Sequence, residues 1–304
     1  MQVLTKLIVH ALPWIPRPII RAVAGRYIAG ETLSEAVRVV KDLHAAGLHA
    51  TVDVLGENET SEEGVKRGVD EYLSLVDALA VVGFPSQISV KPTFLGLRIS
   101  EDLASRSLEA IVAKAEEKQV SVFVDMEDST TTDATLRMFE RLRREHPMVG
   151  VAIQAYLKRS PRDVEALLPL RPAIRICKGI YQESPEVALK DRGAIQESYM
   201  KLATMIVDEG GYPAMATHDP VLVDRCLSLV TSRRLAPASY EFQMLLGVGE
   251  SLRPRLLREG APLRLYCPYG PHWYAYSLRR LKENPKMVGY IVRNLFSRRA
   301  AHRR

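Results

Sequence analysis

The stretch VGVAIQAYLKRSPRDV, residues 149–164, indicates most directly which fold class this chain adopts. It begins with an apolar run, Val149 to Leu157, that has the length of a buried strand. Ser160-Pro161-Arg162-Asp163 follows, in which the serine suits a helix N-cap and the proline suits the first helical position. The stretch therefore predicts a strand followed directly by a helix.

The same pattern recurs along the chain, as short β-rich runs that alternate with longer amphipathic stretches. The other expected strands are HATVDVLG (49–56), ISVKPT (88–93), VSVFVDME (120–127), AIRICKGIY (173–181), YPAMATHD (212–219), SYEFQML (239–245) and LRLYC (263–267). Alternating β and α units with buried, β-branched strands indicate a parallel sheet. Eight such units predict an α/β fold of the (βα)8 TIM type, a closed barrel whose active site lies at the carboxyl ends of the strands.

Local helix signals agree with this alternation. Thr32-Leu33-Ser34-Glu35 is a capping box that opens a helix ending at Gly47, and Asp219-Pro220 opens a later helix. An open, doubly wound sheet is the competing architecture. The chain lacks the GxGxxG turn of that architecture, and its nearest approach, at 247–249, has no third glycine.

Composition describes an ordinary globular protein. Of 304 residues, 47% are hydrophobic and 26% are charged, and the formal net charge is +6. Three cysteines without a metal-binding spacing indicate reduced thiols in a cytoplasmic setting. No apolar run reaches the ~18 residues of a membrane span, and the interrupted N-terminus does not read as a signal peptide.

Basic residues gather at the C-terminus, where they are Arg293, Arg298, Arg299, His302, Arg303 and Arg304. Such a tail can contact anionic lipid or nucleic acid, although composition alone favours a solvated terminus. We expect residues 1–46 to form an N-terminal helical extension. Residues 47–304 are expected to form the catalytic barrel and the basic C-terminal tail.

Polar residues stand at the ends of most expected strands, where a barrel directs side chains into its catalytic mouth. They are Lys91, Asp125, Glu127, Gln154, Arg175, Lys178, Thr217, His218, Gln243 and Tyr266. Each alone has a structural explanation, such as a helix cap or a buried hydrogen bond. Their shared position at one rim predicts a common site.

The segment LRLYCPYGPHWYAYSLRRLKEN, residues 263–284, carries a second indication of function. After a Pro/Gly turn, a helix is expected from about His272. The residues that then share one helix face are Tyr276, Arg279, Arg280 and Glu283. Two arginines on that face suit a small substrate carboxylate, because guanidinium groups bind carboxylates in a fixed planar geometry. The alternative is a solvated helix face beside a buried tyrosine.

Several chemistries are disfavoured. The chain has no HxH or HExxH pair, no GxSxG turn and no acidic cluster suited to magnesium, so no metal site or serine nucleophile is expected. A cationic cavity rich in amides and aromatic rings remains. It could balance a phosphorylated or electron-rich cofactor together with a substrate carboxylate.

The runs VDMED, RICKGIY, ATHD, YEFQMLLGVGE and LRLYCPYG…WYAYSLRRLKEN resemble proline dehydrogenase, in the same order, from about Lys91 to Asn284. The resemblance implies a barrel that binds FAD without a Rossmann module. It implies oxidation of L-proline to Δ1-pyrroline-5-carboxylate, with the electrons passed to a membrane quinone. A separate pyrroline-5-carboxylate dehydrogenase would act downstream, because the chain is too short to carry that activity as well.

The resemblance also implies roles for individual residues. The implied flavin contacts are Met126, Gln154, Arg175, Lys178, Gly179, Thr217, His218, Gln243 and Glu283. The implied substrate contacts are Lys91, Asp125, Tyr181, Leu245, Tyr266, Tyr276, Arg279 and Arg280. Among these, Arg175 would stabilise charge at the flavin edge, and Asp125 would order the site or assist loss of the amine proton. Lys91, Arg279 and Arg280 would pair with the proline carboxylate.

The chain departs from the family at Gln182, where many members have tryptophan, and residues 1–86 carry no assignable motif. Two other interpretations stay open. A class I aldolase would use Lys178 to form a Schiff base, but it leaves the one-face pattern at 276–283 unexplained. A membrane- or nucleic-acid-binding scaffold would use residues 298–304, and it leaves the barrel rim unexplained. We expect a cytoplasmic enzyme with peripheral contact to the inner face of the membrane and no nucleic-acid partner.

Overall fold

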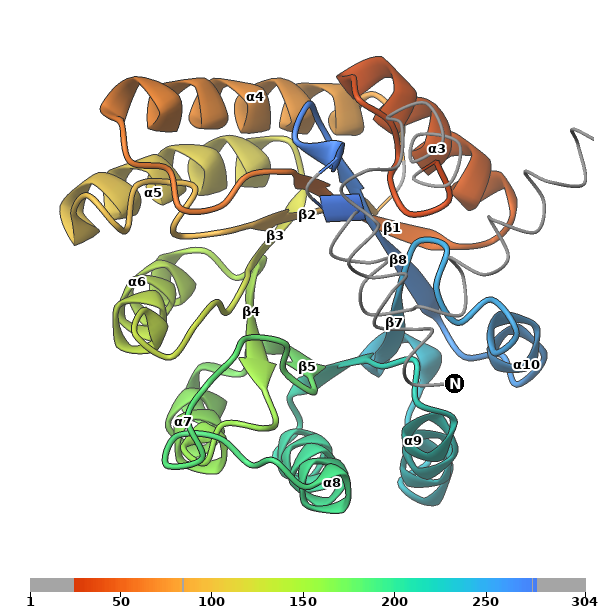
Figure 1. The fold of residues 1–304 in the computed structure, drawn as a ribbon. Coiled ribbons are helices and arrows are strands. Elements are labelled where there is room, and N and C mark those ends of the chain that lie inside the picture. The colour runs from red at the N-terminus through yellow and green to blue at the C-terminus, as the bar shows by residue number, and fades with distance from the viewer. Residues whose placement is uncertain (1–24, 84, 275, 278–304) are drawn as a thin grey trace, which may run out of the picture.

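The computed structural model describes residues 25–83, 85–274, 276 and 277. Eight parallel strands form a closed barrel in which each strand pairs with the next along the chain, and β8 pairs with β1 (Figure 1). The strands are β1 (His49–Val54), β2 (Gln87–Val90), β3 (Ser121–Val124), β4 (Val149–Gln154), β5 (Ala173–Cys177), β6 (Tyr212–Ala216), β7 (Glu241–Leu245) and β8 (Leu263–Tyr269). The predicted (βα)8 barrel is confirmed, and the open sheet is excluded because the sheet closes on itself.

Helices surround the barrel (Figure 1). They are α4 (Glu62–Ala80), α5 (Glu101–Glu117), α6 (Thr132–Glu145), α7 (Ser160–Leu167), α8 (Arg192–Asp208), α9 (Pro220–Ser232) and α10 (Arg253–Arg258), with 3-10 turns η2 (Leu168–Leu170) and η3 (Pro237–Ser239). Helix α3 (Leu33–Ala45) precedes the barrel and packs against β1.

Two of the predicted helix starts are confirmed. The Thr32 hydroxyl accepts a hydrogen bond from the Glu35 backbone, and the Glu35 carboxylate accepts one from the Thr32 backbone, which completes the capping box of α3. The helix ends before Gly47, whose φ of +74° is readily adopted only by glycine. Asp219 caps α9 by accepting a hydrogen bond from the Val221 backbone.

The predicted cap at Ser160 is wrong. Helix α7 begins at Ser160 itself, and the residue before it, Arg159, makes no side-chain cap bond. The Ser160 hydroxyl instead donates to the Gln154 carbonyl oxygen at 2.6 Å. That carbonyl belongs to the last residue of β4, so the serine hydroxyl hydrogen-bonds to the end of a strand and does not cap the helix.

Strand β8 is longer than predicted. The Pro/Gly turn was expected after Cys267, but the strand continues through Pro268 to Tyr269, which lies opposite Val54 of β1. Pro268 lacks an N–H donor, yet its carbonyl oxygen accepts a hydrogen bond from Ala29 at 2.8 Å. This proline therefore fits at the end of a paired strand.

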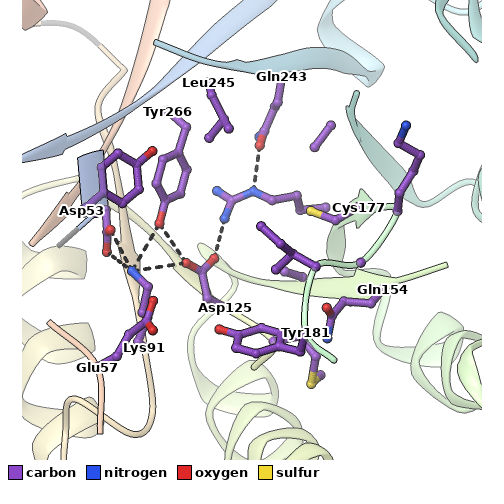
Figure 2. Close-up of a pocket in the computed structure, with 18 of the residues that line it drawn as sticks. Asp53, Glu57, Lys91, Asp125, Gln154, Cys177, Tyr181, Gln243, Leu245 and Tyr266 are labelled. Carbon is purple, nitrogen blue, oxygen red and sulfur yellow. Dashed lines mark hydrogen bonds and ion pairs between the residues drawn. The ribbon is translucent and has the colours of Figure 1, made fainter. Parts of the chain in front are cut away.

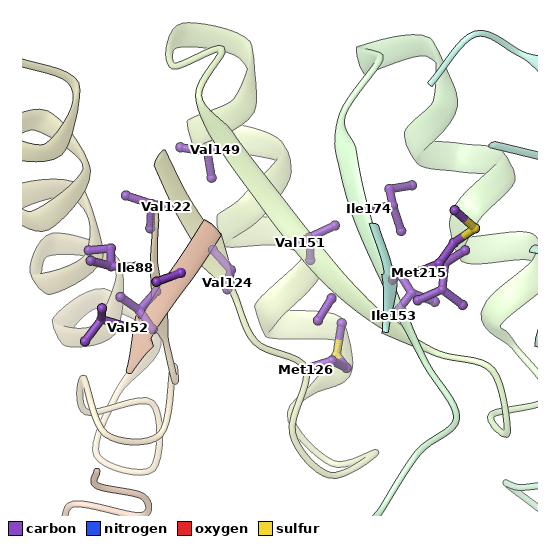
Figure 3. Packing of buried hydrophobic residues seen from close by; sticks show 14 of the residues in the cluster. Val52, Ile88, Val122, Val124, Met126, Val149, Val151, Ile153, Ile174 and Met215 are labelled. Atoms are coloured by element: carbon purple, nitrogen blue, oxygen red, sulfur yellow. The ribbon is translucent and has the colours of Figure 1, made fainter. Parts of the chain in front are cut away.

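Alternation along the strands separates two kinds of buried residue. Apolar side chains such as Ile88, Val122, Val151 and Ile174 belong to the hydrophobic core, which lies between the strands and the helices (Figure 3). Polar residues occupy the positions between them. Arg175 of β5 hydrogen-bonds residues of β2 and β7, strands that are not its neighbours, so these side chains meet inside the barrel.

Candidate active site

A cavity of about 680 Å³ opens at the carboxyl ends of the strands. Of the predicted site residues that the structure describes, all but Glu127 line it; Glu127 is buried, and its carboxylate accepts hydrogen bonds from Thr93 instead. Those that line the cavity are Lys91, Asp125, Met126, Gln154, Arg175, Lys178, Gly179, Tyr181, Thr217, His218, Gln243, Leu245, Tyr266 and Tyr276. Arg279, Arg280 and Glu283 lie outside the described residues. Tyr276, on the same predicted face, is buried and reaches the cavity.

Asp125 follows the last residue of β3 and is the acceptor for three side chains. It receives hydrogen bonds from Arg175 Nη1 at 2.5 Å, from the Ser89 hydroxyl at 2.7 Å and from the Tyr266 hydroxyl at 2.9 Å. Burial, together with the carboxylates of Asp125 and Asp53, holds the pKa of Tyr266 well above its usual value. The Tyr266 hydroxyl therefore stays protonated and remains a donor.

Lys91 follows the last residue of β2 and forms an ion pair inside the barrel. Its Nζ lies 2.7 Å and 2.6 Å from the two carboxylate oxygens of Asp53, and 3.4 Å from the Tyr266 hydroxyl (Figure 2). Burial lowers the pKa of Lys91, but Asp53 and Asp125 outweigh that effect and raise it. Lys91 is therefore a cation whose charge is already matched by a carboxylate.

The sequence pattern predicted that Arg175 stands at the end of its strand, and this prediction is wrong. Arg175 stands in the middle of β5 and is 3% exposed. Its Nε donates to the Gln243 side-chain oxygen at 2.6 Å, and its guanidinium lies over the rings of Phe123 and Tyr266, at 4.7 and 5.4 Å from their centroids. Gln243 is in turn held by Glu241, which accepts from the Gln243 amide at 2.6 Å. The arginine is thus fixed in position on several sides.

Several other residues that line the cavity are uncharged. The His218 Nε2 accepts a hydrogen bond from the Leu245 backbone at 2.8 Å, so this ring nitrogen carries no proton. The Gln154 amide donates to the Glu127 carbonyl oxygen at 2.7 Å. Gly179 has φ +112°, and a Cβ at this position would overlap the Tyr156 ring, so only glycine fits here.

Lys178, the predicted aldolase nucleophile, stands in an unsuitable environment. Its side chain is 41% exposed, and its Nζ lies 3.4 Å from a carboxylate oxygen of Asp219. A Schiff-base lysine is normally desolvated or placed beside another cation. The aldolase interpretation therefore loses the only residue that supported it.

Several residues that line the cavity were not among the predicted site residues. They include Asp53, Glu57, Glu59, Phe94 and His272. Asp53 is the one charged residue in the run ATVDV, and the criterion that selected Asp125, a charged residue near the end of an apolar strand, would have selected it too. Glu57 and Glu59 lie in the loop after β1, where no sequence pattern distinguishes a site carboxylate from a solvated one.

The residues of the cavity fit FAD. The volume of the cavity lies within the range of about 300–1000 Å³ that is typical of ligand pockets. Amide side chains at Gln154 and Gln243 suit the polar edge of a flavin ring, and the cations Arg175 and Lys178 suit its electron-rich edge and a diphosphate.

Comparison with known proteins identifies the family. The sequence model described as proline dehydrogenase matches residues 36–292. Proline dehydrogenase 1 of Bacillus subtilis subsp. natto is 35% identical over 275 residues, which cover 90% of this chain and 91% of that protein. The chain belongs to the proline dehydrogenase family. A proline dehydrogenase of Deinococcus radiodurans is 34% identical over 277 residues, 90% of this chain and 89% of that protein. The predicted family membership is confirmed.

A solved structure agrees with this assignment. Proline utilization A from Bdellovibrio bacteriovorus, inactivated by N-propargylglycine, matches with a TM-score of 0.81 and 26% identity. The match covers 87% of this chain and 33% of that one. This chain therefore spans about a third of the length of that proline utilization A protein.

Proposed function

We propose that this member of the proline dehydrogenase family oxidises L-proline to Δ1-pyrroline-5-carboxylate, with bound FAD as the hydride acceptor. The observation that carries the proposal is the cavity. It collects every described residue that the family resemblance assigns to flavin or substrate. FAD, when bound, supplies the two-electron acceptor that no side chain can supply.

Arg175 is proposed to stabilise developing negative charge. Its guanidinium is held by Asp125 and Gln243 and stacked on Phe123, so it presents a fixed positive charge that needs no rearrangement during the reaction. Asp125 was expected either to order the site or to assist loss of the amine proton. Three donors hydrogen-bond to its carboxylate, two of them from Arg175 and Tyr266, and this supports the ordering role.

Lys91, Arg279 and Arg280 are proposed to bind the substrate carboxylate. Because Lys91 is already paired with Asp53, most of the additional positive charge is expected from the two arginines. Arg279→Met or Arg280→Met should therefore raise KM strongly, since loss of one charge-assisted hydrogen bond costs on the order of 1.5–3 kcal/mol. Steady-state kinetics with L-proline would measure this change, and an unchanged KM for both variants would contradict the assignment.

Tyr266 and Tyr276 are proposed to wall the substrate ring, since both are part of the cavity lining. Their bulk leaves little room for a hydroxyl on the ring, so L-proline is expected to be preferred over 4-hydroxyproline. The ratio of kcat/KM for the two substrates measures this preference.

The visible spectrum of the purified protein, before and after anaerobic addition of L-proline, tests the whole proposal. Flavin bands that bleach with proline would support cofactor, substrate and direction of reaction together. Flavin bands that stay unchanged would contradict the substrate. A colourless protein that does not take up added FAD would contradict the cofactor.

We further propose that a membrane quinone accepts the electrons and that a separate pyrroline-5-carboxylate dehydrogenase consumes the product. The described residues include no helix that is long and apolar enough to cross a membrane. Peripheral contact through the basic tail, residues 293–304, which lies outside the described residues, would keep the enzyme on the inner face of the membrane. Flotation with anionic vesicles at low salt tests this contact, and failure to float would contradict it. Residues 1–46 are proposed to form an N-terminal helical extension of the catalytic barrel, not a separate domain.

A further inference from the structure

Four charged side chains meet at the floor of the cavity. Lys91 and Asp53 form one ion pair, at 2.6 Å, and Arg175 and Asp125 form the other, at 2.5 Å. Lys91 Nζ also lies 4.0 Å from Asp125 (Figure 2). Two positive and two negative charges cancel, so an incoming carboxylate meets no net positive charge from these four residues.

The two carboxylates of the floor are held differently. Asp125 receives hydrogen bonds from a guanidinium and from the hydroxyls of Ser89 and Tyr266. The donor nearest to Asp53 among the described residues is Lys91. The Tyr72 hydroxyl is 3.4 Å from Asp53, but it lies nearer, at 2.9 Å, to the Ser89 carbonyl oxygen and donates there. Asp53 therefore depends on Lys91 more than Asp125 does.

A substrate carboxylate that engages Lys91 competes with Asp53 for the same ammonium group. Asp53 is 1% exposed, and a buried carboxylate that shares its counter-ion with a second anion is strongly destabilised. Protonation of Asp53 removes that cost and leaves one net positive charge on the floor. We propose that binding of the substrate carboxylate is coupled to the uptake of one proton from solvent by Asp53. The inference rests on the proposed function, which places a carboxylate substrate in this cavity.

The surroundings of Asp53 make this uptake accessible near neutral pH. The ionisable groups that face it are Lys91 after β2, Asp125 after β3, Tyr266 and Tyr269 on β8, and Tyr72 on α4. Burial and the carboxylate of Asp125 raise the pKa of the Asp53 carboxyl and Lys91 lowers it, and the net result is a pKa of about 6. A bound anion adds a further negative charge beside it, which raises the pKa of Asp53 again in the complex.

The coupling has a defined pH dependence. Below the pKa of Asp53 in the free protein, the proton is already present, and affinity for the anion is constant. Above that pKa, each binding event must take up a proton, so affinity falls by about tenfold per pH unit until the pKa of the complex is reached. A neutral residue at position 53 removes this dependence and leaves the positive charge of Lys91 uncompensated by Asp53.

Isothermal titration calorimetry of the full-length, flavin-loaded protein with cyclopentanecarboxylate tests the inference. This probe keeps the five-membered ring and carboxylate of the substrate and lacks the amine, so it cannot be oxidised to an imine. Titrations in buffers of different ionisation enthalpy measure the number of protons taken up. About one proton per bound anion is expected for the wild type at a pH about one unit above the pKa of Asp53. Asp53→Asn should take up none, and its affinity should not change with pH.

Glu127→Gln is the matched control. Burial raises the pKa of Glu127 to about 7, so this carboxyl titrates in the same range. It accepts hydrogen bonds from the backbone and hydroxyl of Thr93. The charge of Lys91 lowers its pKa from a distance, but among the described residues Glu127 forms no hydrogen bond or ion pair with Lys91 or Asp53, so its replacement should leave the proton uptake in place.

Each outcome decides the inference. Anion binding without proton uptake by the wild type would overturn it, whether or not Asp53→Asn folds. Uptake that persists in Asp53→Asn, or that disappears in Glu127→Gln, would also overturn it. No binding of the probe at any pH would instead contradict the proposed function of the cavity, and the inference would fall with it.

Discussion

The buried ion pair between Glu241 and Arg264 predicts a large stability change from a single isosteric substitution. Arg264 Nε lies 3.0 and 2.9 Å from the two carboxylate oxygens of Glu241, and the exposed fractions of the two side chains are 10% and 3%. The pair stands near the amino ends of β7 and β8, below the cavity. Glu241→Gln keeps the shape of the side chain and leaves Arg264 buried without its carboxylate.

The expected loss follows from the burial of the pair. Breaking a buried ion pair by removing one partner costs about 3–5 kcal/mol. Arg264 keeps its hydrogen bond to the Ala50 carbonyl oxygen at 2.8 Å, and the glutamine oxygen can still accept one bond, so we expect the lower end, about 3 kcal/mol. Against a total stability of about 5–15 kcal/mol for a typical domain, such a loss is readily measured.

Urea unfolding of the wild type and of Glu241→Gln measures the change as a shift of the midpoint at constant slope. Glu63→Gln is the control, because Glu63 pairs with Arg67 at 2.8 Å on the surface, where the two side chains are 84% and 67% exposed. An exposed helix pair of this kind contributes only about 0.3–0.5 kcal/mol. A loss in Glu241→Gln no greater than in the control would refute the reasoning.

A double substitution separates stability from activity. Replacing both partners by apolar residues, as in Glu241→Met with Arg264→Leu, removes the uncompensated charge and should restore most of the stability. It should not restore activity, because Gln243 loses the carboxylate that directs its side-chain oxygen toward Arg175. Full recovery of kcat in the stable double variant would show that this orientation is not needed.

Three further predictions concern the cavity and its surroundings. Gly179→Ala should lower the amount of flavin retained on purification, because its φ of +112° and the Tyr156 ring leave no room for a Cβ; visible absorbance per mole of protein measures the loss. Tyr266→Phe removes a donor from Asp125 and should lower kcat/KM by about 1–3 kcal/mol in transition-state free energy; an unchanged value would contradict its role. Glu127→Gln should alter the pH dependence of stability. Burial raises the pKa of this carboxyl to about 7, so its contribution is fully present below its unfolded pKa and is lost as pH rises through about 7. As the pH rises from the unfolded pKa of this carboxyl to about 7, the urea midpoint of the variant should therefore fall less than that of the wild type.

The polar residues of the site were predictable one by one but not as pairs. Lys91, Asp125 and Tyr266 stand out in the sequence because each is polar in or beside an apolar strand. The pairing of Lys91 with Asp53 is not visible there, because the two residues are 38 positions apart and meet only when β1 and β2 pair in register. The sequence placed Lys91 at a strand end and the resemblance assigned it to the substrate carboxylate, whereas the structure shows that a carboxylate of the protein already pairs with it.

The amino-acid sequence by itself determined the eight β/α units, the caps at Thr32 and Asp219 and the kinds of side chain at the barrel mouth. These features depend on periodicity and on hydrogen bonds between residues two or three positions apart. Only the tertiary structure decided that Ser160 bonds to the end of β4, that β8 continues through Pro268, and which charges neutralise one another inside the barrel. Those outcomes depend on the register and closure of the sheet, which bring together residues far apart in the chain.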